Sequence, residues 1–256
     1  MRALILSDIH GNLDALESVL ATANGYDQVW HLGDAVGYGA YPNQVIDCLR
    51  AIGTLHVRGN HDRVSSGLHS DEDFNPIAAY AARWTGAQLT AENRDWLRNM
   101  PQGPIFPEGS KAECVHGSPL DEDQYLTSIH EAFDVMRSQQ GLVTFFGHTH
   151  VQGGFSSNGR NWTEITPHYG NQTQAVHWRV PLKMDGSMRY LINPGSVGQP
   201  RDFDWRAAFT IYDDVNGGSA EELVFHRVPY DVAAAQKAII EAGLPERLAS
   251  RLTEGR

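Results

Sequence analysis

The first 150 residues alternate short apolar runs with helical patterns, and polar residues follow each apolar run at once. The apolar runs have the length of buried strands, at residues 3–6, 28–32, 54–57, 112–115 and 142–146. Strands that alternate with helices predict an α/β arrangement, in which sites lie just beyond the strand ends. The polar residues are therefore expected at one edge of a sheet.

Capping residues indicate where several helices begin. Asn12 precedes a pattern whose apolar residues share one helical face. Ser128 and Glu131 have the spacing of a capping box before another helix. Residues 75–99 are predicted to form two helices, with Thr90 as the cap between them.

After residue 150 the pattern changes to β-type runs. Antiparallel strands joined by turns such as Asn216-Gly217-Gly218 are predicted at residues 174–180, 189–192, 207–212 and 222–228. Asp231 then caps a helix at 232–242, and a second short helix follows Pro245.

These patterns predict the fold class α/β (α+β), as a four-layer αββα sandwich in which helices flank two mixed β-sheets. The prediction is a single domain over residues 1–256. It includes a helical insertion at about 75–100 and a C-terminal helical tail at about 231–253.

Composition and charge narrow the function. A net charge of -11 argues against an extended nucleic-acid-binding surface, although metal ions can make one pocket locally positive for an anionic substrate. No apolar run approaches the ~20 residues that a membrane span needs, and the start lacks the apolar stretch of a signal peptide. A cytoplasmic protein without membrane association is expected. Cys48 and Cys114 lie far apart, which disfavours a disulfide framework or a cysteine zinc site.

Five polar segments supply oxygen and nitrogen ligands without sulfur: Asp8-Ile9-His10, Gly33-Asp34, Gly59-Asn60-His61-Asp62, His116-Gly117 and Gly147-His148-Thr149-His150. On an extended segment, residues i and i+2 point the same way, so Asp8 and His10 could grip one metal ion. His148 and His150 repeat this spacing. Taken alone, either pair is more simply a polar surface turn.

Asp34 lies 26 residues after Asp8 and 26 residues before Asn60, and each interval fits one strand–helix–strand step. Adjacent carboxylates repel each other unless cations lie between them. The alternatives for single segments are ordinary: a Gly-Asp turn, an Asx-turn loop around Asn60, and a histidine at 116 hydrogen-bonded to backbone. Because all five polar segments occur at strand ends, a shared metal site is favoured over these alternatives. Its oxygen and imidazole ligands suit Mn, Fe, Zn, Ni or Co.

The order of these motifs resembles the calcineurin-like metallophosphoesterase superfamily over nearly the whole chain. The segment Asn193-Pro194-Gly195-Ser196-Val197-Gly198-Gln199-Pro200-Arg201 is similar to one in the small bacterial and archaeal phosphodiesterase-like branch. The tail around Gly243-Leu244-Pro245 also resembles that branch.

The resemblance implies two divalent metal ions, with manganese expected. It implies that the first ion is bound by Asp8, His10, Asp34 and His150, and the second by Asp34, Asn60, His116 and His148. It also implies that His61 is not a ligand but faces the leaving group, with Asp62 as its partner.

The chain departs from the superfamily at one informative place. Protein phosphatases of this superfamily carry an Asp-Arg-Gly after their Gly-Asp, and that arginine binds the phosphate, whereas residues 33–39 here read Gly-Asp-Ala-Val-Gly-Tyr-Gly. This disfavours protein phosphatase activity, and Gly37-Tyr38-Gly39 could leave space for a second ester group. Arg63 and Arg201 are candidates for substrate binding, although a surface arginine is the simpler interpretation of each.

The resulting hypothesis is a dinuclear-metal-dependent phosphodiesterase acting on a small phosphorylated substrate, such as a nucleotide derivative. A hydroxide that bridges the metals attacks phosphorus, and His61 acts as general acid. A phosphomonoesterase or nucleotide pyrophosphatase using the same site is the second enzymatic interpretation. A non-catalytic scaffold of this fold is the alternative from another class, and it is disfavoured because the ligands and His61 are all present.

Overall fold

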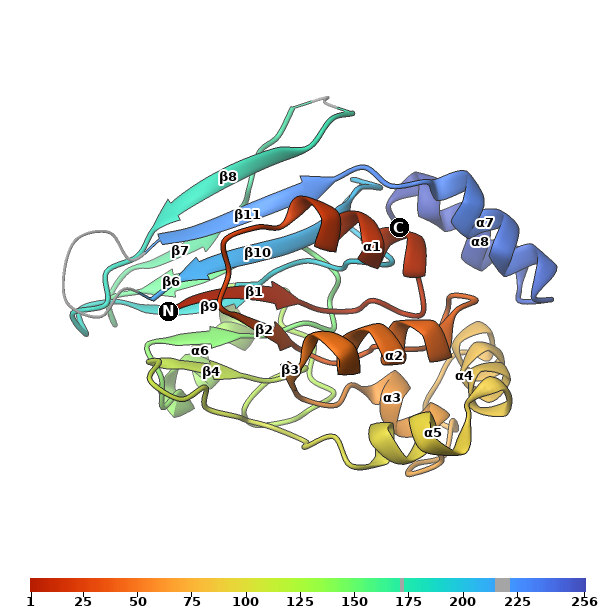
Figure 1. Cartoon of the computed structure of the whole chain (residues 1–256). Coiled ribbons are helices and arrows are strands. Elements are labelled where there is room, and N and C mark those ends of the chain that lie inside the picture. The colour runs from red at the N-terminus through yellow and green to blue at the C-terminus, as the bar shows by residue number, and fades with distance from the viewer. Residues whose placement is uncertain (171–172, 215–221) are drawn as a thin grey trace.

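Two β-sheets lie face to face in the computed structural model, which describes residues 1–170, 173–214 and 222–256 (Figure 1). The first sheet has the strand order β3 (Thr54–His56), β2 (Gln28–His31), β1 (Arg2–Leu6), β10 (Ala207–Asp213), β11 (Glu222–Val228), β8 (Val176–Pro181). The second has the order β4 (Ala112–Cys114), β5 (Val143–Phe145), β9 (Arg189–Asn193), β6 (Gly153–Ser157), β7 (Trp162–Ile165). Both are mixed, with parallel pairs at one side and antiparallel pairs at the other.

Helices cover the outer face of each sheet. The described helices are α1 (Leu13–Thr22), α2 (Pro42–Ile52), α3 (Asn60–Ser65), α4 (Pro76–Gln88), α5 (Ala91–Arg98), α6 (Ile129–Ser138), α7 (Val232–Glu241) and α8 (Glu246–Glu254). Apolar residues of α1, α2, α7 and α8 pack on the first sheet, and α6 packs on the second. Another apolar core fills the space between the sheets. The predicted αββα sandwich with two mixed sheets is confirmed.

Side-chain caps begin the helices where the sequence indicated. The Asn12 side chain accepts from the backbone N–H of Ala15, and Thr90 caps α5 in the same way. Ser128 and Glu131 form the predicted capping box of α6. These caps satisfy backbone donors that have no partner inside the helix.

Four segments differ from the sequence prediction. Residues 60–65 form the short helix α3, where the sequence predicted no helix, and β6 and β7 are strands that were not predicted. β9 does not extend an antiparallel run, because it joins the second sheet between parallel β5 and antiparallel β6. The predicted turn at Asn216-Gly217-Gly218 lies outside the described residues.

The segment predicted as a helical insertion contains α4 and α5. Trp84 and Trp96 are partly buried against the core of the first sheet, while Tyr80 is exposed and donates a hydrogen bond to the backbone oxygen of Gly243. Within the described ranges, no helix is both long enough and apolar enough to cross a membrane.

Candidate metal centre

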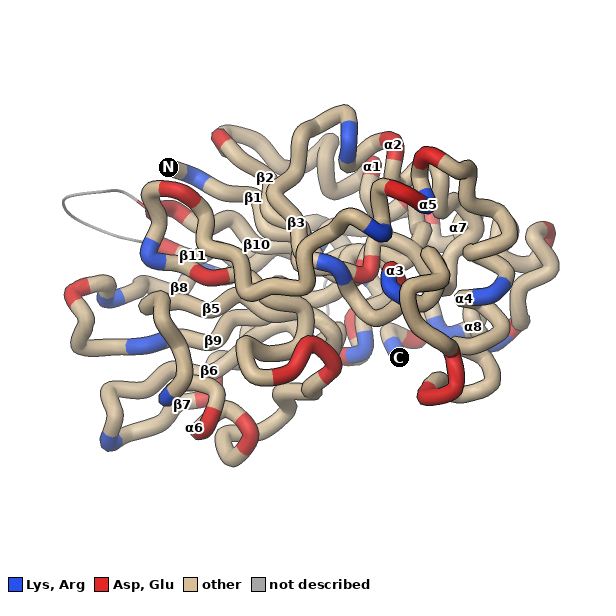
Figure 2. The backbone as a smooth tube through the Cα atoms, turned by 90° about the horizontal axis from the view of Figure 1, so that it is seen from below, with Lys and Arg blue, Asp and Glu red and all other residues tan. Residues whose placement is uncertain are grey.

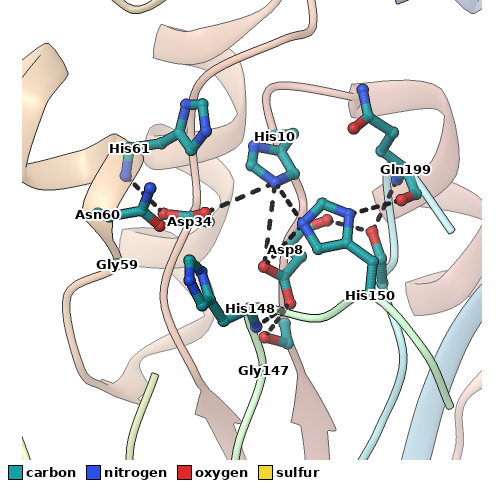
Figure 3. A network of polar contacts seen from close by, with 12 residues as sticks. Asp8, His10, Asp34, Gly59, Asn60, His61, Gly147, His148, His150 and Gln199 are labelled. Carbon is teal, nitrogen blue, oxygen red and sulfur yellow. Dashed lines mark hydrogen bonds and ion pairs between the residues drawn. The ribbon is translucent and has the colours of Figure 1, made fainter. Parts of the chain in front are cut away.

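The polar segments predicted at strand ends meet beyond the carboxyl ends of β1, β2, β4 and β5. Figure 3 labels residues from these segments other than the one that contains His116. Asp8 and His10 follow β1, Asp34 follows β2, Asn60 begins α3, His116 follows β4, and His148 and His150 follow β5. Six of these seven side chains are buried, and Asn60 is half-buried. The parallel pairing of β1, β2 and β3 therefore brings Asp8, Asp34 and Asn60 to one edge, as their spacing predicts.

The backbone presents the candidate ligands in a conformation that the sequence did not indicate. Six described residues other than glycine have positive φ, and five are Asp8 (53°), His10 (51°), Asp34 (55°), His148 (65°) and His150 (60°). The prediction that the Asp-x-His and His-x-His pairs lie on extended segments is therefore wrong. A left-handed residue costs about 1–3 kcal/mol, and such strain concentrates at functional sites.

Backbone hydrogen bonds between neighbouring loops hold this strained conformation. The N–H of Asp8 donates to Gly33 O at 3.0 Å, and the N–H of His10 donates to Asp34 O at 3.0 Å. The N–H of His148 donates to Asp8 Oδ2 at 3.1 Å, which joins the loops of the two sheets.

One group of potential ligand atoms surrounds Asp8. Asp8, His10, Asp34 and His150 each offer an atom within 4.8 Å of the others. Asp8 Oδ1 lies 3.2 Å from His150 Nε2, and Asp34 Oδ2 lies 3.6 Å from His10 Nε2. Asp8 Oδ1 is buried and has no hydrogen-bond partner among the described residues.

A second group shares Asp34 with the first. Asp34, His116 and His148 again offer atoms within 4.8 Å of one another. Asp34 Oδ2 lies 3.5 Å from His116 Nε2, and Asn60 Oδ1 lies 3.1 Å from the same nitrogen. Asp34 is thus placed between two clusters, where its carboxylate can contact two cations.

Each of the four histidines has one ring nitrogen facing a backbone carbonyl. The pairs are His10 Nδ1 with Val36 O at 3.1 Å, His116 Nδ1 with Leu32 O at 2.8 Å, His148 Nε2 with Asp123 O at 3.1 Å, and His150 Nδ1 with Gln199 O at 2.6 Å. A carbonyl only accepts, so each of these nitrogens carries a proton, and in the neutral ring the other nitrogen is a bare lone pair.

The bare nitrogens face each other in pairs. His10 Nε2 lies 3.1 Å from His150 Nε2, and His116 Nε2 lies 3.1 Å from His148 Nδ1. Two lone pairs cannot form a hydrogen bond, whereas a cation between them would satisfy both. Histidines that ligate metals commonly donate their other N–H to a carbonyl in this way. The donor set therefore fits metal ions.

The pKa of Asp34 is consistent with a site for cations. Burial, together with the nearby charges of Asp62 and Asp8, raises the pKa of Asp34 well above its ordinary value, against the opposing effect of His116. Buried carboxylates at this separation repel each other, and cations relieve that repulsion.

Asp62 and His61 have different surroundings. The Asp62 carboxylate accepts from the backbone N–H groups of Asp34 (2.8 Å), Gly59 (3.0 Å) and Val36 (3.2 Å). Its described hydrogen bonds thus go to two ligand-bearing loops and not to the ring of His61. Burial raises the pKa of Asp62 to about 6, although these backbone donors lower it.

The His61 ring is held by aromatic neighbours at the edge of a cavity. Its centroid lies 4.5 Å from that of Tyr38, 4.7 Å from that of Phe74 and 4.9 Å from that of His10. Tyr38, His61, Phe74 and Tyr125 are among the residues that line the cavity, whose volume is about 240 Å³. The Tyr38 side chain therefore lines the cavity, whereas the sequence suggested that residues 37–39 leave space for a second ester group.

The two arginines predicted as substrate ligands differ in their partners. Arg63 lines the cavity, but its guanidinium pairs with Glu122 and with Asp123 at 2.6 Å. Arg201 donates to Gln199 Oε1 at 3.2 Å and has no carboxylate partner among the described residues. Its backbone N–H donates to His150 O at 3.1 Å, so its backbone is bonded to the loop that carries the candidate ligand His150.

Sequence reasoning missed two residues near the site. Tyr125 stacks on His148 with ring centroids 4.0 Å apart and is 49% exposed. Arg251, on α8, has its guanidinium carbon 6.0 Å from the centroid of the Tyr38 ring. Neither lies in a recognisable motif. Only tertiary packing brings them to the site, so no signal in the sequence indicated either.

Comparisons with known proteins agree on a family. The model of the calcineurin-like phosphoesterase superfamily domain matches residues 1–213. An uncharacterized protein of Methanocaldococcus jannaschii is 34% identical over 257 residues, covering 98% of this chain and 97% of that protein. The crystal structure of a metallophosphoesterase from Sphaerobacter thermophilus has a TM-score of 0.80 and 38% identity, covering 100% of this chain and 99% of its own.

A further relative carries a more specific name. A protein of Hamiltonella defensa named bis(5'-nucleosyl)-tetraphosphatase, symmetrical, is 24% identical over 200 residues. The match covers 75% of this chain and 65% of that protein.

Proposed function

The chain belongs to the calcineurin-like phosphoesterase superfamily, and from that premise we propose that it is a dinuclear-metal-dependent phosphodiesterase. The observation that carries the proposal is the orientation of the four buried histidines. Their protonated nitrogens face carbonyls, and their bare nitrogens face each other at 3.1 Å. This arrangement is unfavourable for the protein alone and favourable around cations.

The proposed ligands follow the two clusters. The first ion is assigned to Asp8, His10, Asp34 and His150, and the second to Asp34, Asn60, His116 and His148. Mn²⁺ is the proposed metal among the ions that suit oxygen and imidazole donors without thiolate, which also include Fe, Zn, Ni and Co. When bound, such ions supply Lewis-acid stabilisation of phosphoryl oxygens and lower the pKa of water toward ~7.

His61 is proposed as the proton donor to the leaving oxygen. Its ring lines the cavity, and its buried Nδ1 has no hydrogen-bond partner among the described residues. Burial and the charge of Arg201 lower the pKa of His61 well below its ordinary value. An anionic phosphoryl group beside the ring favours the protonated form, so substrate binding would prepare the acid. Asp62 is proposed to position the loops rather than to transfer a proton.

Hydrolysis of a nucleotide anhydride is the second candidate function. It is favoured by the similarity to proteins named bis(5'-nucleosyl)-tetraphosphatase. The aromatic residues Phe74 and Tyr125 on the cavity wall would suit a nucleobase.

The test is a substrate panel on the metal-loaded protein. We expect hydrolysis of bis(p-nitrophenyl) phosphate that exceeds hydrolysis of p-nitrophenyl phosphate, is lost with EDTA and returns with Mn²⁺. Diadenosine tetraphosphate tests the second candidate. Absence of bound metal, or a metal-loaded protein inactive on all three, would overturn the enzymatic proposal in favour of a scaffold.

A substitution separates metal binding from proton transfer. His61→Ala should lower turnover by about 10²–10⁴-fold, because general acid catalysis contributes that much. The variant should keep two equivalents of Mn²⁺, measured by mass spectrometry. His130→Ala, an exposed residue on α6, is the control for removing a histidine. Turnover of His61→Ala at the parent rate would remove His61 from the reaction.

A further inference from the structure

Two arginines flank the ring of Tyr38 beside the metal centre. The guanidinium carbons of Arg201 and Arg251 each lie 6.0 Å from the centroid of that ring. The same ring lies 4.6 Å from the ring of His10 and 4.5 Å from the ring of His61, centroid to centroid. The Tyr38 ring therefore lies next to both arginines, to the proposed ligand His10 and to the proposed acid His61.

Neither guanidinium is paired with a carboxylate side chain among the described residues. Where the structure describes the chain, neither Nη atom of Arg251 has a hydrogen-bond partner. The Arg251 Nε donates to the backbone oxygen of Arg256, and the buried Arg201 Nε has no partner. Other arginines near them are paired: Arg247 with Glu254 at 3.2 Å and Arg206 with Asp204 at 2.5 Å.

This concentration of positive charge is unusual in a chain whose net charge is -11. Both side chains are half-buried, so each guanidinium has given up part of its hydration without gaining a carboxylate side chain as partner. Figure 2 shows basic segments close to α8 and the C-terminus, with acidic segments nearby. Guanidinium groups match the geometry of phosphate oxygens, which they bind in a bidentate manner.

We propose that Arg201 and Arg251, against Tyr38, form a second anion subsite that binds a phosphoryl group of the substrate other than the one attacked. This inference rests on the proposed metal-dependent hydrolysis and favours its second candidate, a nucleotide anhydride as substrate. It narrows the substrate to an organic ester of pyrophosphate or a longer polyphosphate, such as a nucleoside polyphosphate. A diester with one phosphorus would occupy the metal centre and leave the arginines without an anion.

The first experiment measures binding without catalysis. Inorganic tripolyphosphate is titrated into the full-length, metal-free protein by calorimetry. We expect binding that weakens by about tenfold or more in Arg251→Met, because hydrogen bonds to charged groups are lost. Arg251→Lys should recover part of the affinity. Arg247→Met, on the same helix but paired with Glu254, is the matched control and should bind as the parent does.

The second experiment uses the Mn²⁺-loaded protein. Arg251→Met should raise KM for diadenosine tetraphosphate by about tenfold, with little change for bis(p-nitrophenyl) phosphate, which has no second phosphoryl group. An equal effect on both substrates, or tripolyphosphate binding unaffected by Arg251→Met, would overturn the subsite. A parent protein that hydrolyses neither substrate would overturn the proposed function, while the calorimetric result would still decide the anion subsite.

Discussion

Asp62 is a buried carboxylate that holds loops of the proposed metal centre without being one of its proposed ligands. It accepts from the backbone N–H groups of Asp34, Gly59 and Val36, which belong to two different loops. The loop after β2 carries Asp34, and the loop before α3 carries Asn60. Two of the four proposed ligands of the second ion, Asp34 and Asn60, therefore depend on the same carboxylate for their position.

Asp62→Asn tests this role. The amide keeps the size of the side chain but places N–H donors against backbone N–H groups, so at least one hydrogen bond is lost. We expect Mn²⁺ affinity to fall by about 10–100-fold, as is typical when partners of metal ligands are removed. Calorimetric titration of Mn²⁺ measures this, with Asp95→Asn, an exposed residue of α5, as the control. Unchanged Mn²⁺ affinity in Asp62→Asn would show that the loops carrying Asp34 and Asn60 keep their position without the Asp62 carboxylate.

At the residue scale, the sequence identified the ligand candidates better than their conformations. Oxygen and nitrogen side chains spaced by strand–helix–strand steps pointed to Asp8, Asp34 and Asn60. The left-handed conformations of Asp8 and Asp34 arise from hydrogen bonds between loops distant in sequence, which local patterns do not encode. Arg251 escaped prediction for the same reason, because only the packing of α8 brings it to Tyr38.

At the element scale, the loop after β5 approaches the loop after β1 too closely for a side chain at Gly147. A Cβ added there would overlap Ser7 Oγ and lie 2.8 Å from Asp8 Oδ2. Asp8 Oδ2 also accepts from the N–H of His148, so the contact is part of the centre itself. The glycine is therefore required by the proximity of the two sheets.

Gly147→Ala is expected to displace Asp8 and to abolish binding of at least one Mn²⁺ equivalent. Overpacking at such a contact costs about 1–3 kcal/mol, which should also lower Tm. Gly159→Ala is the control, because its methyl group would meet nothing within 4 Å and its φ of +84° costs only backbone strain. Metal content by mass spectrometry distinguishes them. Two bound equivalents in Gly147→Ala would contradict the close approach.

The elements that the sequence did not predict depend on their neighbours. β6 begins with two glycines, a pattern typical of turns, but it pairs with both β7 and β9. α3 begins where the N–H of His61 donates to Asp34 Oδ1 at 2.8 Å. In both cases tertiary hydrogen bonds outweigh weak local propensity.

At the scale of the whole molecule, the four layers bury several titratable groups that metal binding does not explain. His31 lies on β2 beside His56 of β3 and is fully buried, and neither ring nitrogen has a hydrogen-bond partner among the described residues. Burial, with a smaller effect of His56, lowers the pKa of His31 to about 3. The unfolded chain has the ordinary histidine pKa of about 6.5.

This difference makes folding stability depend on pH. Between about pH 6.5 and 3 the unfolded state binds a proton at His31 that the folded state does not bind, so stability falls as the pH falls. One such group contributes a slope of up to about 1.4 kcal/mol per pH unit. His31→Leu should be at least as stable near pH 7, since no hydrogen bond is lost, and should show a shallower decline toward pH 5. Denaturant unfolding in EDTA at several pH values measures the slopes, with the exposed His130→Gln as the control. Equal slopes for His31→Leu and the parent would mean that His31 does not remain neutral in the folded protein.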